Sequence, residues 1–182
     1  RNSSSAASDV YKRQDLVLEI TRGAEKQIKL GIIQTDFTEL DATQIIDVIK
    51  NDLERTGEFI LIPSTEMLSI PTSPDSVIHR DWLLLDADAI IFLTTEKLGK
   101  SIDIAYSIYD IRAKKIVLKK KIYGVPDGLR QSSHYVSDGI YKHYYGIEGV
   151  SSTKLMYVAK NDDIYRLIVS DADGFNEQTL LK

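Results

Sequence analysis

The sequence predicts an α/β fold with a mixed sheet, followed by a shorter all-β part. Two observations indicate this organisation. Strand and helix patterns alternate up to about residue 145, whereas beyond residue 152 short apolar strands are separated only by tight Asp, Asn and Gly turns. A chain of 182 residues is long enough for one domain with a substantial core and a piece of a second domain.

The chain opens on a segment that we exclude from the fold. Residues 1–14 are rich in Ser and Ala and show no hydrophobic periodicity, so we expect either non-native sequence or a disordered leader. From residue 15 the pattern changes. Leu16, Leu18 and Ile20 alternate with other residues, which predicts a strand with one apolar face that ends at Gly23.

A strand–helix–strand unit is predicted next. Residues 29–33 form an apolar strand, and Asp41 followed three residues later by Gln44 is a variant of the capping box that begins a helix. Gly57 is expected to end this helix, and residues 59–62 form the next strand. The helix should bury Ile45, Ile46, Ile49 and Leu53. This spacing favours a crossover connection and hence a locally parallel pair of strands.

The middle of the chain predicts a long loop and then three strands. Residues 63–81 are rich in Pro, Ser and Thr, with one helical turn expected at 65–68 and another at 82–85. Residues 89–94 are apolar on both faces, which is typical of a central strand. A turn at Gly99 leads into a long alternating strand, and residues 116–122 are expected to be its hairpin partner.

One amphipathic helix is predicted over residues 130–145. Ser132 or Ser133 could cap its start, because a hydroxyl there can accept a hydrogen bond from a free N–H of the first turn. Gly146 suits the left-handed residue that ends such a helix. Its apolar face is predicted to carry Val136, Ile140, Tyr141, Tyr144 and Tyr145. We interpret residues 15–147 as one α/β domain that ends with this helix.

Residues 148–182 are interpreted as a linker and the start of a second domain. Strands are expected at 155–159, 165–170 and 179–181, with turns at 161–163 and 171–174. Such a three-strand meander is a propeller blade or a piece of a sandwich, and alone it leaves sheet edges open. We therefore expect the chain to be a fragment of a longer protein.

Composition excludes several classes of function. The net charge of −4 and the pI of about 5.4 give no general attraction to nucleic acid or to anionic lipid. The absence of Cys excludes disulfides, thiol nucleophiles and thiolate metal sites. No apolar run approaches the ~20 residues of a membrane-spanning helix, so no membrane insertion is expected. No phosphate-binding loop or dinucleotide motif is present, and no cofactor is predicted.

Two polar motifs are candidate sites. His134 and Asp138 lie one helical turn apart beside Ser133, but a nucleophile on the same helix as its base lacks the oxyanion donors of acyl transfer. We therefore predict no catalytic residue, and instead a hydrogen bond on the helix surface or a contact between domains. Asp138 and Lys142 are also spaced as an i,i+4 ion pair. Residues 171–174 lack the spacing of a calcium loop, so a hairpin turn and no metal are expected.

A basic cluster could bind nucleic acid, although another explanation is favoured. Lysines on the strand at 116–122 more often coat the solvent face and protect an edge strand. The cluster consists of Lys114, Lys115, Lys119, Lys120 and Lys121.

The helix at 130–145 and the segment after it resemble the TolB family of the Tol–Pal system. The matching residues are Arg130, His134, Ser137, Asp138, Ile140, Tyr141, Gly146, Ile147, Gly149, Thr153, Tyr157, Val158, residues 165–167 and residues 170–176. Weaker matches are residues 18–20, Gly23, Asp52, Leu53, Gly57 and Phe59. The sequence departs from the family at Tyr144 and Tyr145, where Leu-Thr is usual, and at Ser151, where an aromatic residue is usual.

The resemblance implies an N-terminal α/β domain hinged to a β-propeller, of which only a truncated first blade is included. It implies a non-enzymatic, monomeric adaptor in the periplasm, which binds a Pal-like protein through the propeller and a TolA-like protein through its N-terminal segment. By position, that segment is Asp15, Leu16, Val17, Leu18, Glu19, Ile20 and Thr21. The expected interdomain residues are Arg130, His134, Asp138, Gly146 and Gly149.

Two alternatives remain open from the sequence. The chain could be the front part of a propeller-bearing serine hydrolase whose chemistry lies in a later domain. It could also be a nucleic-acid-binding α/β domain that uses the lysine-rich strand.

Overall fold

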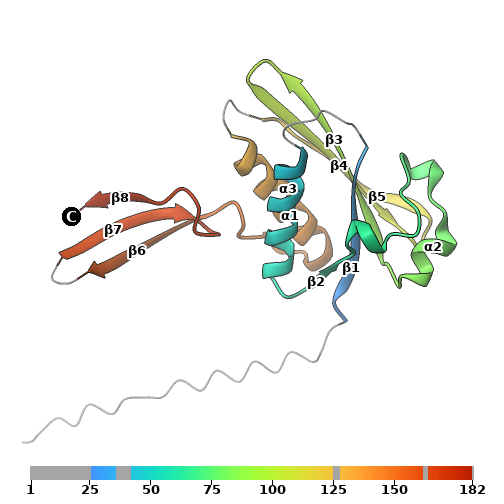
Figure 1. The fold of residues 1–182 in the computed structure, drawn as a ribbon, viewed down its shortest axis with the longest axis horizontal. Coiled ribbons are helices and arrows are strands. Elements are labelled where there is room, and N and C mark those ends of the chain that lie inside the picture. Colours follow the sequence, from blue (N-terminus) through green and yellow to red (C-terminus); the bar gives the residue numbers. More distant parts are fainter. Residues whose placement is uncertain (1–25, 36–41, 125–127, 162–163, 182) are drawn as a thin grey trace, which may run out of the picture.

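The computed structural model describes residues 26–35, 42–124, 128–161 and 164–181 (Figure 1). The first part of the chain contains, in order, β1 (Ile28–Gln34), α1 (Ala42–Arg55), β2 (Phe59–Leu61), α2 (His79–Leu84), β3 (Ala89–Leu98), β4 (Ser101–Asp110), β5 (Lys115–Ile122) and α3 (Leu129–Tyr145). The second part contains β6 (Lys154–Asn161), β7 (Ile164–Asp171) and β8 (Gln178–Leu181).

Within the described residues, the strands form two separate sheets. The first has five strands in the order β2-β1-β3-β4-β5, and the second has three in the order β6-β7-β8. Strand β1 pairs in parallel with both β2 and β3, whereas β3, β4 and β5 form antiparallel pairs. The α/β class, the mixed sheet and the parallel crossover through α1 are therefore confirmed. The strands after residue 153 do not join the first sheet.

The five-stranded sheet has an apolar core on each face. Helices α1 and α3 lie side by side on one face, and α2 with its neighbouring loops covers the other (Figure 1). The alternation of strand side chains produces this division, since Ile91 packs under the two helices and Ile90 packs on the opposite face near Trp82. The predicted central strand at 89–94 is confirmed as β3, although it extends to Leu98.

Helix α3 differs from its sequence prediction at its start. It begins at Leu129, and Gly128 occupies the cap position without a side-chain hydrogen bond. The predicted serine cap is wrong because the helix begins one turn earlier, and the Ser133 hydroxyl donates instead to the Leu129 carbonyl. The predicted end is confirmed, because Gly146 has a left-handed φ of 71° and its N–H donates to the Lys142 carbonyl.

The structure differs in detail from the predictions for two short turns and for the buried face of α1. The turn expected at 65–68 is a 3-10 turn at Ser64–Glu66, and the turn expected at 82–85 is the helix α2. Ile46 is only partly buried, while Val48 joins the buried set. The strand expected around Leu18, the cap at Asp41 and part of the turn at 161–163 lie outside the described residues.

Candidate functional site

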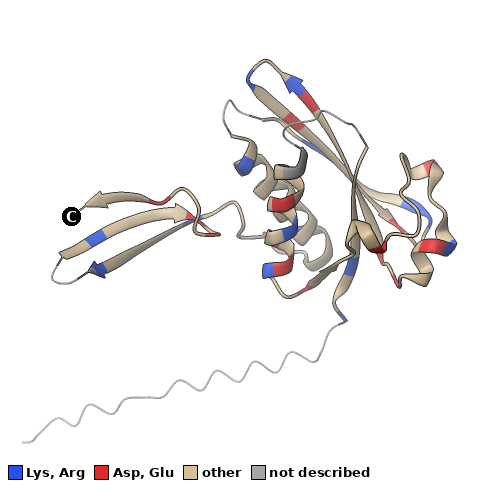
Figure 2. Ribbon diagram, viewed as in Figure 1, with Lys and Arg blue, Asp and Glu red and all other residues tan. Residues whose placement is uncertain are grey.

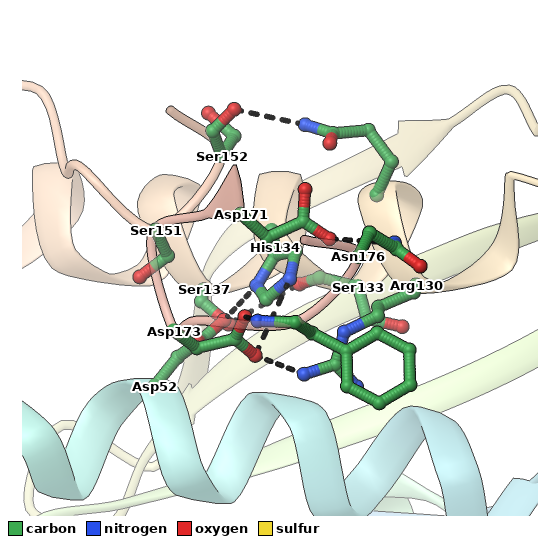
Figure 3. A network of polar contacts seen from close by, with 12 residues as sticks. Asp52, Arg130, Ser133, His134, Ser137, Ser151, Ser152, Asp171, Asp173 and Asn176 are labelled. Atoms are coloured by element: carbon green, nitrogen blue, oxygen red, sulfur yellow. Dashed lines mark hydrogen bonds and ion pairs between the residues drawn. The ribbon is translucent and has the colours of Figure 1, made fainter. Parts of the chain in front are cut away.

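The polar side chains of interest gather where α1, α3 and the turn between β7 and β8 meet (Figure 3). We call this group the junction cluster, and its central members are Asp52, Arg130, His134, Asp138, Asp171 and Asp173. The cluster joins the five-stranded sheet, through its helices, to the three-stranded sheet.

His134 connects the two helices. It is 1% exposed, and its Nδ1 lies 2.6 Å from Oδ2 of Asp52, which is also 1% exposed. The second oxygen of Asp52 accepts a hydrogen bond from Arg55 at 3.3 Å. Of the two expectations for His134, the hydrogen bond on the helix surface is wrong, because α1 covers the imidazole. The other expectation, a contact between domains, stays a prediction. This buried pair holds α1 against α3, because separating the helices would leave a buried polar group of each helix without its hydrogen-bond partner.

Asp173 brings the second sheet to the same helix. Its Oδ2 lies 3.9 Å from His134 Nε2 and pairs with the Arg130 guanidinium, while its Oδ1 accepts the Phe175 N–H at 3.1 Å. The guanidinium also lies 4.2 Å from the centre of the Phe175 ring. Arg130 therefore meets the β7–β8 turn both as an ion pair and through a cation–π contact.

The carboxylates of this turn are held in their charged form. Burial acts to raise the pKa of Asp173, but the Phe175 N–H, Arg130 and His134 outweigh burial, so the pKa lies below its usual range. Burial also opposes ionisation of Asp171, yet its hydrogen bonds from Lys154 and Asn176 again place the pKa below the usual range. The turn is thus stabilised by charge at neutral pH.

Asp138 fixes the linker. Its two carboxylate oxygens accept the N–H groups of Ser151 at 2.8 Å and Ser152 at 2.9 Å. The predicted ion pair with Lys142 is wrong, because Lys142 bonds to Glu148 and the carboxylate of Asp138 points to the linker. Gln131 adds a hydrogen bond to the Ser152 carbonyl at 3.0 Å. Two backbone donors on one buried carboxylate set the direction in which the chain leaves α3.

Gly149 is required by the close approach of the linker to α3. A Cβ at this position would lie 2.8 Å from the Asp138 Cα and 2.9 Å from its Cγ. We therefore expect Gly149→Ala to lower the free energy of unfolding by about 2 kcal/mol, because the linker must move off the carboxylate. Gly146→Ala is the matched control, since its cost of about 1 kcal/mol comes from backbone strain in open space. Urea unfolding measures both variants, and equal costs would contradict the role given to Asp138.

The cluster also has the composition of a metal site. Asp52, His134 and Asp173 each offer a ligand atom within 4.8 Å of the others. However, the 2.6 Å between Nδ1 and Asp52 is a direct hydrogen bond, and Arg130 already pairs with Asp173. The geometry favours a hydrogen-bonded ionic network over a metal centre.

The remaining predicted residues are distributed as follows. The segment from Asp15 to Thr21 lies outside the described residues. The lysines of β5 are exposed, and Lys121 pairs with Glu96 at 3.0 Å and with Asp103 at 2.9 Å. Charges of both signs are spread over the described chain (Figure 2), rather than forming a single basic face. His79 opens α2 and bonds to the Tyr109 hydroxyl at 2.8 Å.

The five residues expected between the domains all lie at or beside the junction. Arg130, His134 and Asp138 contact the linker or the β7–β8 turn, and Gly149 packs on Asp138. Gly146 ends α3. Sequence reasoning missed the central role of Asp52, which lies 82 residues before its partner His134. The available signal was that Asp52, a charged residue, lies next to Leu53 on the face of α1 that was predicted to be buried.

Comparisons with known proteins identify the family. The sequence profile of the TolB amino-terminal domain matches residues 16–117, which is more than half of the chain. The chain belongs to the TolB family. The predicted resemblance to TolB is therefore confirmed, and the family is generally non-enzymatic.

The sequences of individual TolB proteins align with nearly the whole of this chain. The Tol-Pal system protein TolB of Marinomonas sp. (strain MWYL1) is 32% identical over 178 residues, covering 93% of this chain and 41% of that protein. The TolB of Pseudomonas syringae pv. syringae (strain B728a) is 28% identical over 183 residues, covering 97% and 42%. The chain thus spans about two fifths of the length of these relatives.

A solved structure shares the fold. The crystal structure of TolB from Acinetobacter baumannii superposes with a TM-score of 0.74 at 21% identity, covering 87% of this chain and 39% of that chain. Among the described residues of the present chain, no helix has the length and apolar character needed to span a membrane.

Proposed function

We propose that the chain is part of a non-enzymatic periplasmic adaptor of the Tol–Pal system, which binds a TolA-like protein through residues 15–21 and a Pal-like protein through a propeller. Membership of the TolB family carries this proposal. We further propose that residues 15–147 form the N-terminal domain and that residues 148–182 are the linker and the start of the first blade.

The surface of the three-stranded sheet supports the propeller. Its strands carry large apolar side chains with half or more of their surface exposed, among them Met156, Val158, Tyr165 and Leu181. Met156 and Tyr157 are neighbours on β6, so they point to opposite faces, and both are exposed. Apolar residues on both faces of a sheet require cover on both faces, which neighbouring blades would provide.

The arrangement of the junction supports an adaptor. The α3 helix contacts the core of the five-stranded sheet on one side. On the other side it contacts the β7–β8 turn through Arg130 and the linker through Asp138. A protein that links two partners needs its two binding parts held in a defined orientation, and this cluster supplies that orientation. No partner is predicted to be a nucleic acid, since the basic strand β5 is partly neutralised by Glu96 and Asp103.

A pull-down with the C-terminal domain of a TolA-like protein tests the N-terminal segment. We expect the chain to retain that domain, and deletion of residues 15–21 to abolish retention. Deletion of residues 1–14 is the matched control and should preserve binding. Within the segment, changing Leu16, Leu18 and Ile20 to Asn should weaken binding more than Val17→Asn with Glu19→Gln, because strand addition uses alternate side chains.

Two results would contradict this assignment. Binding that survives deletion of residues 15–21 would remove the segment from the interface. Equal weakening by both sets of substitutions would show that the segment does not bind as a strand.

A further inference from the structure

Beyond the proposed adaptor role, the junction cluster contains an arrangement that an uncharged His134 does not satisfy. Nδ1 lies 2.6 Å from Asp52 Oδ2, and Nε2 lies 3.9 Å from Asp173 Oδ2. Both ring nitrogens therefore face carboxylates, one on α1 and one on the turn between β7 and β8 (Figure 3). The ring is buried, and Nε2 has no hydrogen-bond partner among the described residues.

A neutral imidazole carries a single N–H. If this hydrogen is on Nδ1 and is donated to Asp52, the lone pair of Nε2 faces the oxygen of Asp173, and two acceptors oppose each other. If the hydrogen is on Nε2, the lone pair of Nδ1 is held 2.6 Å from the Asp52 oxygen, which is more repulsive still. Only the imidazolium offers a donor to each carboxylate.

We propose that His134 is a proton-dependent clamp between the two sheets of this protein. The imidazolium donates a hydrogen bond to Asp52 of α1 and attracts Asp173 of the β7–β8 turn by its charge across 3.9 Å. Loss of one proton leaves the bond to Asp52 and opens the contact to Asp173. The clamp is internal to the chain and does not depend on the identity of any partner.

The other charges around the ring come from each element packed against it. Helix α1 contributes Asp52 with Arg55 bonded to it, and α3 contributes Arg130, bonded to Asp173, and Asp138 one turn along. The second sheet contributes Asp173 itself and Asp171, which pairs with Lys154. Arg130 stays on Asp173 when the imidazolium loses its charge, so the expected response is a loosening of the turn and not its release.

Amide hydrogen exchange of the full 182-residue chain, labelled with ¹⁵N, tests the clamp between about pH 5.5 and about pH 8.5. The N–H groups of Gly174 and Phe175 report on the turn, because they bond to Asp171 O and Asp173 Oδ1. Backbone amides of Ile91 and Ile108 in the central strands serve as the internal reference. The ¹⁵N shifts of the His134 ring, from the same sample, follow its proton.

With rates corrected for intrinsic exchange, we expect protection of the turn to fall about tenfold as the ring loses its proton, while the reference amides stay constant. In Asp173→Asn the turn should be weakly protected at every pH. Glu177→Gln is the matched control, since it removes a carboxylate of the same turn that bonds to the Tyr157 hydroxyl, and it should keep the pH-dependent step.

Three outcomes would overturn the proposal. The ring could titrate while protection of the turn stays constant. The ring could keep one protonation state across the whole range. Asp173→Asn could retain the full step. The first two are read from the unmodified chain, so they do not depend on the folding of a variant. None of these measurements involves a TolA-like or Pal-like protein, so the clamp can fail while the proposed function stands.

Discussion

Replacing His134 by Leu should lower the free energy of unfolding of the chain by about 3 kcal/mol. The carboxylate of Asp52 would remain buried between α1 and α3, with only the half-exposed Arg55 as its cation among the described residues. Removing one partner of a buried pair costs more than the pair itself contributes, because the other charge is left without compensation. Urea unfolding followed by the fluorescence of Trp82, the single tryptophan, measures the loss.

Two further variants distinguish the loss of stability caused by breaking the Asp52–His134 pair from the loss caused by any His→Leu substitution on α3. The double variant Asp52→Leu with His134→Leu should recover most of the stability, because an apolar pair can replace a buried ionic one at little cost. His143→Leu, on the exposed side of the same helix, should change stability by less than about 0.5 kcal/mol. A His134→Leu variant as stable as His143→Leu would show that the pair does not hold the helices together.

Gly31→Ala should also lower the free energy of unfolding by about 3 kcal/mol. The cause is steric overlap with Trp82 in the core on the α2 face of the five-stranded sheet. A Cβ on Gly31 would lie 2.6 Å from Cη2 of Trp82, whose side chain is fully buried. Strand β1 is hydrogen-bonded on both edges, to β2 and to β3, so it cannot shift to make room. Chemical unfolding followed by circular dichroism measures the change.

The Trp82→Leu background provides the control for this prediction. Leu lacks the ring atoms that approach Gly31, so the additional cost of Gly31→Ala should fall below about 1 kcal/mol there. The same cost in both backgrounds would show that backbone properties of Gly31, and not the tryptophan ring, set the requirement for glycine.

Local patterns in the sequence predicted most of the first sheet. The spacing of Ile45, Ile49 and Leu53 identified the buried face of α1, and Gly146 identified the end of α3. The separate sheet after residue 153 was also predictable, because its short strands alternate with Asp and Gly turns. These features depend on neighbours within a few residues, which is the range over which hydrophobic periodicity and turn chemistry act.

The contacts of the junction could not be predicted in the same way. Asp138 was assigned to Lys142 because the two are one turn apart, but a buried carboxylate is better satisfied by the two linker N–H groups. His134 finds Asp52 and Asp173, 82 residues before it and 39 residues after it, through the packing of α1 and the path of the linker. Such pairings are set by tertiary structure, and spacing along the chain carries no information about them.

The position of β1 between β2 and β3 determines when this protein can fold during its synthesis. Leu30 aligns with Leu61 on one side and with Ala89 on the other, so the strand gains its second neighbour 59 residues later. By contrast, β3 pairs with its immediate successor β4, and β4 pairs with its immediate successor β5. A ribosome must therefore release the chain beyond Leu93 before β1 can pair on both edges, whereas the β3–β4 and β4–β5 hairpins need only strands that are adjacent in the sequence.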